Sequence, residues 1–313
     1  MYIGFDIGGT NLAIALVNDD YEIIARDKMR TGASRGTESV VGDILTLCDR
    51  ICEAAGVSRK DIRRVGLGCP GAIEPGTGKV VFSGNLPLGG VPLRDIVAEH
   101  WSVPVTVEND ANCAALGEAL AGAARGVGTS ALITLGTGVG SGIVIDRKIY
   151  RGFNGAGGEI GHSVIVEGGR PCTCGRLGCW EAYSSATGLV RMTREAMLRD
   201  KGSLMWELSE GNLEKAGGRT SFKAARAGDR RGIEVVGEYV KYLACGITNV
   251  INIFQPEVIC IGGGVCNEGA YLLDPVMEIV NRDRYAKDMV RTEVKIAELG
   301  NDAGIIGAAF AGA

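Results

Sequence analysis

The sequence has few aromatic residues and no long apolar run. Phe, Trp and Tyr make up 5% of its 313 residues. No stretch approaches the roughly 18 consecutive apolar residues of a transmembrane helix, so we expect no membrane span. Acidic and basic residues nearly balance, with a formal net charge of −4. This balance excludes a global attraction to nucleic acid or to an anionic membrane surface, and we expect no partner of either kind.

A secretory leader is also lacking. Met1 leads directly into an apolar segment without the basic residues that open a signal peptide, so we expect a cytoplasmic protein with reduced thiols. Histidine is scarce, with two residues, whereas ten cysteines are present. Six cysteines stand among apolar neighbours and are predicted to be reduced core residues. They are Cys48, Cys52, Cys69, Cys113, Cys245 and Cys260.

Glycine, by contrast, is abundant. The 49 glycines and few aromatics are typical of an α/β protein with many tight loops, and the length allows two domains. Residues 2–19, YIGFDIGGTNLAIALVND, predict a strand, a turn at Gly8, Gly9 and Thr10, and a second strand. Such a turn presents backbone N–H groups and a hydroxyl to a phosphate, and Asp6 is placed to hold Mg²⁺ through water. An ordinary hairpin with a solvated aspartate is the alternative.

A second segment has the same form. Residues 130–145, SALITLGTGVGSGIVI, predict a strand, a Gly-Thr-Gly turn at 136–138 and another strand. Two such units in one chain indicate a duplicated fold. The repetition favours the phosphate interpretation, in which the two turns hold a polyphosphate from both sides.

Two strand ends in the first half precede irregular or polar segments. The predicted strand Val65–Cys69 runs into a loop at 70–88, where Pro and Gly prevent a regular element. Loops at strand ends are where α/β folds place ligand contacts. The strand Val103–Val107 leads to Asn109 and Asp110. Asp110 has two compatible interpretations: the N-cap of the next helix, or a carboxylate that, with Asn109, holds a sugar hydroxyl and takes its proton.

The segment Gly161–Glu181 concentrates histidine and cysteine. Imidazole nitrogen and thiolate sulfur are the donors that Zn²⁺ prefers, and four of them in a short span predict a closed, structural zinc site. A loop with free thiols near a hydrogen-bonded histidine is the alternative. Glu159, just upstream, is expected to be buried and within reach of this segment. The predicted ligands are His162, Cys172, Cys174 and Cys179.

Helical periodicity accounts for much of the remaining chain. The segments Ser39–Ala55 and Gly232–Phe254 each carry apolar residues on one side, which predicts core-facing helices. After a strand at Val258–Ile261, the run Gly262, Gly263 and Gly264 lets the backbone lie flat against a planar ligand such as adenine. The final segment, GNDAGIIGAAFAGA, predicts a small-residue helix that packs closely on another element.

Together these motifs resemble the ROK family (repressor, open reading frame, kinase) of actin-like sugar kinases, and its bacterial glucokinase branch in particular. The resemblance covers the whole chain. The motifs occur in the family's order: DIGGT (6–10), ENDAN (108–112), LGTGVGSG (135–142), GGEIGH (157–162), CTCGRLGCWE (172–181) and GGGV (262–265).

The resemblance implies an α/β fold of the ribonuclease-H-like, actin-like ATPase class, with two lobes, a duplicated βββαβαβα unit and an interlobe cleft. The small lobe is expected at residues 1–118 plus 299–313 and the large lobe at 119–298. The implied activity is transfer of the γ-phosphoryl group of ATP to the 6-hydroxyl of glucose, with Mg²⁺ and a structural Zn²⁺. A homodimer through the large lobe is also implied.

The resemblance further assigns roles to residues. Asp110 is the expected general base. Family members often carry Lys or Thr after DIGGT, so the neutral Asn11 here is expected to alter phosphate affinity. The sugar contacts are expected from Gly71, Asn85, Asn109, Asp110, Glu159, His162 and Glu181. The nucleotide and Mg²⁺ contacts are expected from Asp6, Gly8, Gly9, Thr10, Asn11, Gly136, Thr137, Gly138, Gly262, Gly263 and Gly264.

Two alternatives share these motifs. A kinase for N-acetylmannosamine or another hexosamine differs in the shape of the loop Gly71–Leu88, which the sequence does not define. A sugar-responsive repressor carries a helix-turn-helix extension before the phosphate hairpin. Here the hairpin begins at Met1, so a repressor is disfavoured.

Overall fold

The computed structural model describes residues 1–312. The chain divides into two compact units. Ala313, the last residue of the predicted small lobe, lies outside the described residues. Unit 1 comprises Met1–Leu132, Ser141–Gly158 and Ala297–Ala313, and unit 2 comprises Ile133–Gly140 and Glu159–Ile296.

The first sheet has five strands in the order β3-β2-β1-β4-β7. Strands β1 to β3 pair antiparallel, and β4 and β7 extend the sheet parallel to β1. The register aligns Asp6 with Gly68 and Gly68 with Glu108, so the carboxyl ends of the parallel strands meet at one edge. The strands are β1 Tyr2–Ile7, β2 Asn11–Val17, β3 Ile23–Arg30, β4 Arg64–Cys69 and β7 Val105–Asn109, with a small hairpin, β5 Ala72–Ile73 and β6 Val80–Phe82, after β4.

The second sheet repeats this order as β10-β9-β8-β11-β12. Strands β9 and β10 are antiparallel, whereas β11 and β12 are parallel. Each sheet is thus built from a three-strand meander followed by helix-linked strands, which confirms the predicted duplication. The strands are β8 Ser130–Leu135, β9 Val139–Ile145, β10 Lys148–Ile149, β11 Val258–Gly262 and β12 Glu293–Ile296.

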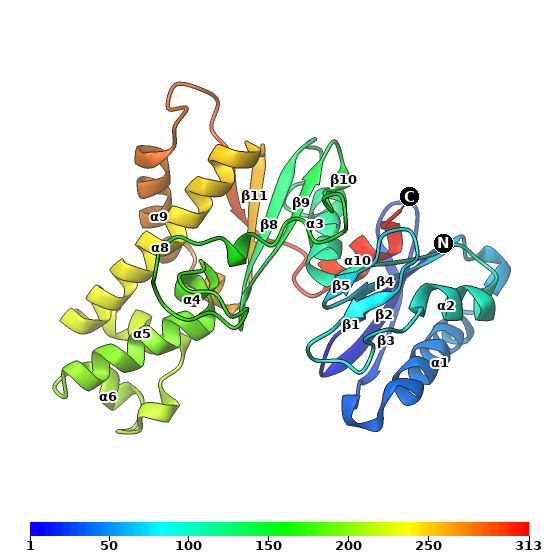
Figure 1. The fold of residues 1–313 in the computed structure, drawn as a ribbon, viewed down its shortest axis with the longest axis horizontal. Coiled ribbons are helices and arrows are strands. Elements are labelled where there is room, and N and C mark those ends of the chain that lie inside the picture. Colours follow the sequence, from blue (N-terminus) through cyan, green and yellow to red (C-terminus); the bar gives the residue numbers. More distant parts are fainter. Residues whose placement is uncertain (313) are drawn as a thin grey trace. The chain divides into compact units, whose positions relative to one another are not determined.

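The helices α1 (Thr37–Ala55) and α2 (Leu93–Trp101) pack on one face of the first sheet (Figure 1). Alternation along β1 sends Ile3, Phe5 and Ile7 into this core. The residues between them, Gly4 and Asp6, face the opposite side of the sheet. The Asp6 side chain therefore lies on the face that the main core does not fill.

The opposite face of the first sheet is covered by α10 (Asp302–Phe310) at backbone contact. A Cβ atom on Gly4 would lie 2.0 Å from the Ile305 carbonyl oxygen, and one on Gly66 would lie 1.7 Å from that of Ala308. The same helix touches α3 (Asp110–Ala121), where a Cβ atom on Gly307 would meet the Cys113 carbonyl oxygen at 1.7 Å. The predicted small-residue helix and its close packing are confirmed.

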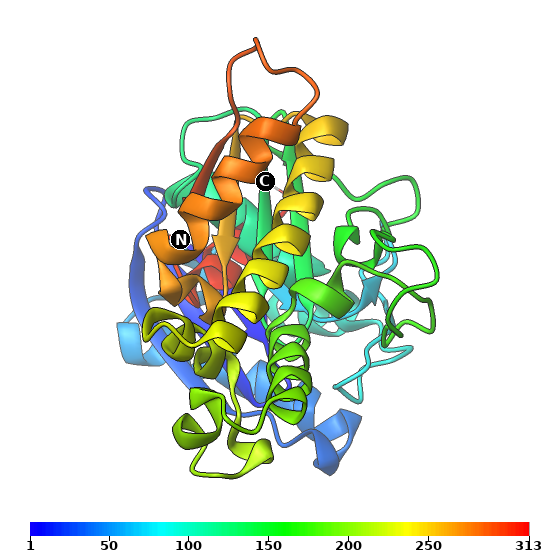
Figure 2. The same ribbon diagram turned by 90° about the vertical axis from the view of Figure 1, so that its left-hand side faces the viewer.

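Unit 2 carries a helical layer beside the second sheet. Figure 2 shows its longest helix, α8 (Arg230–Phe254, yellow), running beside α9 (Ala270–Asp283, orange). Helix α8 begins two residues before the predicted start because Asp229 caps it, accepting a hydrogen bond from the Gly232 N–H at 2.7 Å. The other helices are α4 Glu181–Ser184, α5 Ala186–Arg199, α6 Leu204–Leu208 and α7 Gly218–Arg226.

One cysteine prediction is wrong. Cys245 is exposed on α8, because the buried side of that helix is formed by neighbours such as Leu243 and Ile247. The other five predicted core cysteines are buried. Within residues 1–312, no helix combines the length and apolar character that crossing a bilayer requires.

Candidate active site

The first glycine turn joins β1 to β2 and is held by the backbone and by one buried threonine. The Gly8 N–H donates to the Asn11 carbonyl at 2.9 Å. Thr31, which the sequence reasoning missed, donates its hydroxyl to the Gly8 carbonyl at 2.5 Å and its N–H to the Thr10 carbonyl at 3.0 Å. Thr31 is fully buried, so the turn is fixed from behind while Thr10 and Asn11 stay exposed.

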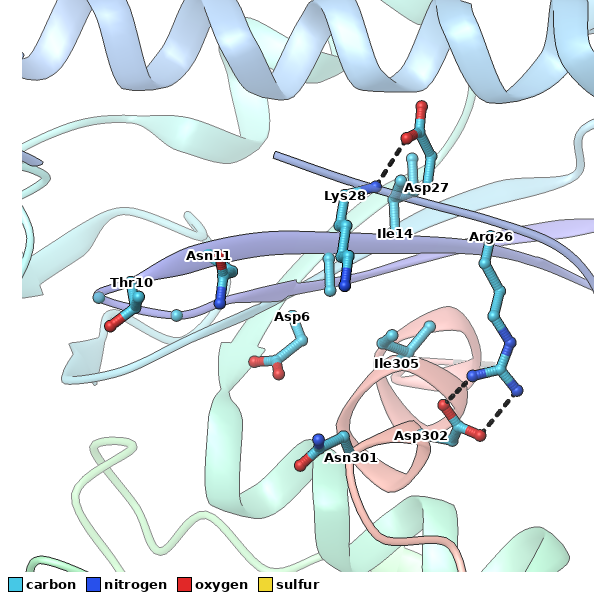
Figure 3. Close-up of a pocket in the computed structure, with 13 residues that line it drawn as sticks. Asp6, Thr10, Asn11, Ile14, Arg26, Asp27, Lys28, Asn301, Asp302 and Ile305 are labelled. Atoms are coloured by element: carbon cyan, nitrogen blue, oxygen red, sulfur yellow. Dashed lines mark hydrogen bonds and ion pairs between the residues drawn. The ribbon is translucent and has the colours of Figure 1, made fainter. Parts of the chain in front are cut away.

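A cavity of about 730 Å³ opens beside this turn. Asp6, the turn residues 8–11, Lys28 and Asn301 are among the residues that line it (Figure 3). Burial, and then the negative charge of Asp110, raises the pKa of the Asp6 carboxyl to about 6. A buried carboxylate with a nearby second carboxylate is a place where a divalent cation relieves charge repulsion.

The strand end of β7 places Asn109 and Asp110 beside the loop that follows β4. Asn109, not Asp110, is the N-cap of α3: its side-chain oxygen accepts hydrogen bonds from the N–H groups of Ala111 at 2.9 Å and Asn112 at 3.1 Å. The N-cap interpretation of Asp110 is therefore wrong. The Asn109 amide also donates to the Gly71 carbonyl at 3.2 Å, which ties the two predicted sugar-binding segments together.

Asp110 is the first residue of α3 and makes no ion pair with any residue in the described part of the chain. Its carboxylate accepts one hydrogen bond, from the Ala111 N–H at 2.9 Å. Burial raises the pKa of Asp110, and the backbone N–H groups of the first helical turn oppose that shift. The result is a partly buried carboxylate with acceptor capacity left for a ligand.

Glu108 supports this corner from inside the protein. Its carboxylate is buried, accepts from the Asn109 N–H at 2.9 Å and the Asn112 amide at 3.0 Å, and pairs with Arg151. Neither Glu108 nor Arg151 is among the site residues predicted from the sequence. The signal for Glu108 was an acidic residue at the end of an otherwise apolar strand, whereas nothing local in the sequence pointed to Arg151.

Asn85 and Gly71 occupy the loop after β4. A Cβ atom on Gly9 would lie 3.6 Å from Asn85 Cβ, so Asn85 lies directly against the first glycine turn. Gly71 has φ +119°, and a Cβ atom there would meet the Phe82 carbonyl oxygen at 2.0 Å, so only glycine fits. The structure thus brings together, within unit 1, every predicted residue from Asp6 to Asp110.

The second glycine turn belongs to unit 2 and is held by hydrogen bonds from its neighbours. The Ala186 N–H donates to the Gly136 carbonyl at 2.8 Å, and the Val139 N–H donates to the Glu181 carboxylate at 3.1 Å. A Cβ atom on Gly138 would lie 2.3 Å from that carboxylate. Thr137 stays exposed at the tip.

The three-glycine run lies next to this second turn. Gly262 ends β11 and Gly264 begins a short 3₁₀ helix. Gly263 has φ +96°, and a Cβ atom there would meet the Leu135 carbonyl oxygen at 2.3 Å, directly before Gly136. Unit 2 therefore brings both predicted nucleotide segments together.

The four predicted zinc ligands converge. Their ligand atoms all lie within 4.8 Å of one another. Cys172 Sγ lies 3.6 Å from His162 Nδ1, and Cys174 Sγ lies 3.6 Å from Cys179 Sγ. The distance between the two sulfur atoms is too long for a disulfide. Three thiols and one imidazole are, however, a donor set that suits a tetrahedral Zn²⁺.

Two features fix the segment Gly161–Glu181, called the zinc segment after its predicted ligands, to its unit. A Cβ atom on Gly178, at φ +82°, would lie 1.7 Å from the Val166 carbonyl oxygen, so the segment folds back on itself at backbone contact. Trp180, directly after Cys179, is fully buried and donates its indole N–H to the Tyr242 carbonyl at 2.9 Å. A Cβ atom on Gly246 would lie 1.9 Å from its ring.

Glu181 connects the zinc segment to the second glycine turn. One carboxylate oxygen accepts from the Val139 N–H at 3.1 Å, and the other accepts from the Thr173 hydroxyl at 2.9 Å. Thr173 stands between two of the predicted ligands, Cys172 and Cys174. Glu159 differs from expectation: its side chain is exposed rather than buried, although its carbonyl accepts from the His162 N–H at 3.1 Å.

Comparison with known proteins identifies the family. The model of the ROK family matches residues 2–311. The chain belongs to the ROK family. The prediction made from the six motifs is confirmed.

Similar proteins include glucokinases and a hexokinase. A glucokinase of Halalkalibacterium halodurans is 40% identical, over 98% of this chain and 93% of that protein. The structure of a ROK family glucokinase from Streptomyces griseus in complex with glucose and AMPPNP is 34% identical, covers 98% of this chain and 97% of that chain, and has a TM-score of 0.79. A ROK hexokinase from Thermus thermophilus is 31% identical, covers 99% and 97%, and has a TM-score of 0.85. These similarities confirm the predicted fold class.

The raised pKa of Asp6 gives a prediction for stability. The folded pKa of about 6 exceeds the ordinary value of 3.8, so ionisation of Asp6 costs folding free energy once the pH rises above about 4. This cost grows as the pH rises from about 4 to 6 and is then constant. We expect Asp6→Asn to be more stable than the parent by roughly 3 kcal/mol at pH 8, measured by urea unfolding in EDTA.

The matched control is Asp20→Asn, an exposed aspartate of the same unit, which should leave the unfolding midpoint unchanged. A destabilised Asp6→Asn variant at pH 8 would contradict the assigned burial of this charge.

Proposed function

We propose that this protein is an ATP-dependent hexose kinase that transfers the γ-phosphoryl group of ATP to the 6-hydroxyl of glucose. One observation carries the proposal: Asp110, free of ion pairs among the described residues, lies at the same strand edge as Asp6 and the first glycine turn. A phosphate-binding turn and an available carboxylate are the two parts that this reaction requires. The similarity to glucokinases supports glucose as the substrate.

In the proposed reaction the protein mainly positions the sugar and ATP and neutralises the negative charge of the phosphates. Asn109 and Asp110 orient the sugar hydroxyl, and the Asp110 carboxylate accepts its proton as the oxygen attacks the γ-phosphorus. The new O–P bond forms as the bond from the γ-phosphorus to the bridging oxygen breaks, and ADP leaves. Mg²⁺, held near Asp6, would offset phosphate charge when bound.

The burial of Asp110 fits this role. A carboxylate with a raised pKa is a stronger base than a solvated one, because the protein stabilises its negative charge less well. Asn109 forms the helix cap, so the Asp110 carboxylate accepts one hydrogen bond from the first turn of α3 and keeps its remaining acceptor capacity.

We further propose that His162, Cys172, Cys174 and Cys179 bind a structural Zn²⁺. The convergence of one imidazole and three thiols supports this assignment. His162 would then bind the metal through Nδ1, the nitrogen nearest Cys172, and keep its other nitrogen for a sugar hydroxyl. The remaining assignments are proposed on the family resemblance. They are the sugar contacts of Gly71, Asn85, Glu159 and Glu181, and the nucleotide contacts of both glycine turns and of the three-glycine run. The lobe boundaries at 118 and 298 and the homodimer are proposed on the same basis.

Substrate identity is tested with a coupled assay for ADP release. The panel is glucose, mannose, fructose, allose, N-acetylglucosamine and N-acetylmannosamine with MgATP. We expect glucose to give the highest kcat/KM. Preference for an acetamido sugar would change only the assigned substrate, whereas no turnover with any sugar would overturn the kinase assignment.

The role of Asp110 is tested by Asp110→Asn. This change keeps the size of the side chain and removes the proton acceptor, so we expect kcat to fall by at least about 10² with little change in MgATP affinity. Asp61→Asn, an exposed aspartate of unit 1, is the control. A kcat near that of the parent in a folded Asp110→Asn protein would exclude the general base.

The metal assignment is tested by elemental analysis and chelation. We expect one zinc per chain, lost in Cys174→Ser. Removal of the metal should weaken glucose binding more than MgATP binding in calorimetry, because His162 belongs to the zinc segment. The Gly136 carbonyl, in contrast, keeps its separate bond from the Ala186 N–H. Equal loss of both affinities would show that the segment only supports the fold.

A further inference from the structure

The cavity at the first glycine turn contains one cation that no other described residue neutralises. Of the basic residues that line it, Arg26 is paired with Asp302 through two hydrogen bonds, at 2.5 and 2.8 Å. Asp27, also at the cavity, is bound by Arg50 from α1 at 2.5 and 2.8 Å. The Lys28 ammonium group has no hydrogen bond or ion pair with the described residues. It is exposed and therefore available to a ligand.

The strand register directs Lys28 toward the turn. Asp6 on β1 is paired with Ala13 on β2, and Ala13 is paired with Lys28 on β3. These three residues form one row across the sheet and share one face. With strands spaced about 4.8 Å apart, the Cα atoms of Asp6 and Lys28 are roughly 10 Å apart.

Ala13 leaves the space between them open. Its methyl group is too short to separate the two longer side chains, so the Lys28 side chain can extend over it toward the turn. Figure 3 shows Lys28 pointing from β3 into the cavity, on the side where the Asp6 carboxylate lies. The neighbouring row is different. There Arg26, which lies opposite Ala15 in the strand register, forms an ion pair with Asp302 at the start of α10.

The charge balance of the cavity calls for a cation. Asp6 and Asp110 are close enough to repel, and a polyphosphate would add further negative charge. The turn itself supplies backbone N–H groups and the neutral side chains of Thr10 and Asn11. Of the basic residues that line this cavity, Lys28 is thus the one whose positive group is available to a ligand.

We propose that Lys28 is a phosphate-binding residue that contacts the nucleotide's phosphate groups at the first glycine turn. This inference rests on the proposed kinase function. It also accounts for a neutral residue at position 11, since the positive charge reaches the turn from β3 instead of from the residue that follows the turn. An ammonium group binds phosphate as a point charge, so its contribution falls with salt concentration.

The test compares Lys28→Met with the parent in calorimetric binding of MgATP, MgADP and adenosine. Methionine keeps much of the side-chain length and removes the charge. We expect MgATP affinity to fall about tenfold, with a weaker dependence on salt, while adenosine affinity and the KM for glucose stay unchanged. Lys28→Arg should retain most of the affinity.

Two further variants make the result specific. Lys60→Met removes an exposed lysine of unit 1 that does not line the cavity, and its MgATP affinity should equal that of the parent. Asn11→Lys in the Lys28→Met background returns a cation to the turn and should recover at least half of the lost binding free energy.

The outcomes separate this inference from the kinase assignment. A parent protein that binds no MgATP overturns the proposed function itself. A parent that binds MgATP while Lys28→Met binds it equally well overturns the role of Lys28 alone. An equal loss for adenosine and MgATP also overturns that role, because it shows a general disturbance rather than a lost phosphate contact.

Discussion

The close approach of α10 to the first sheet and to α3 is the constraint on which unit 1 depends. At Gly4, Gly66 and Gly307 the backbones touch, so no side chain fits between the elements. This packing fixes the relative positions of β1, β4 and α3, and these elements carry Asp6 and Asp110. The two carboxylates, whose charges act on each other, are thereby placed by main-chain contact rather than by flexible side chains.

At the carboxyl edge of the first sheet, different polar residues provide the structural hydrogen bonds and the carboxylate proposed for chemistry. Asn109 satisfies the first turn of α3, and Glu108 holds Asn109 and Asn112 from inside with the help of Arg151. Asp110 is left with a single backbone hydrogen bond. Its neighbours thus supply the structural bonds, while the residue proposed for chemistry keeps its acceptor capacity.

Much of this arrangement could be predicted from the sequence, because local patterns determine it. Alternation in residues 2–19 and 130–145 predicts both hairpins, and donor chemistry predicts the four converging residues that we propose as metal ligands. Glycines at the turns marked places where the chain approaches another backbone, as the structure shows at Gly71 and Gly263.

The remaining features depend on contacts between distant segments. The buried pair of Glu108 with Arg151 and the support of Gly8 by Thr31 require tertiary packing that no local pattern records. Two neighbouring polar residues, Asn109 and Asp110, are equally good helix caps by type, so only the exact end of β7 decides between them. Exposure of Cys245 and Glu159 likewise depends on which side of an element faces its neighbours.

Gly138 limits how unit 2 could be re-engineered. A Cβ atom at this position would lie 2.3 Å from the Glu181 carboxylate, so a side chain there would displace that carboxylate. Glu181 in turn holds Thr173 in the zinc segment. A substitution at Gly138 would therefore also affect Thr173, which stands between two of the proposed metal ligands, so the second turn and this segment are coupled through Glu181.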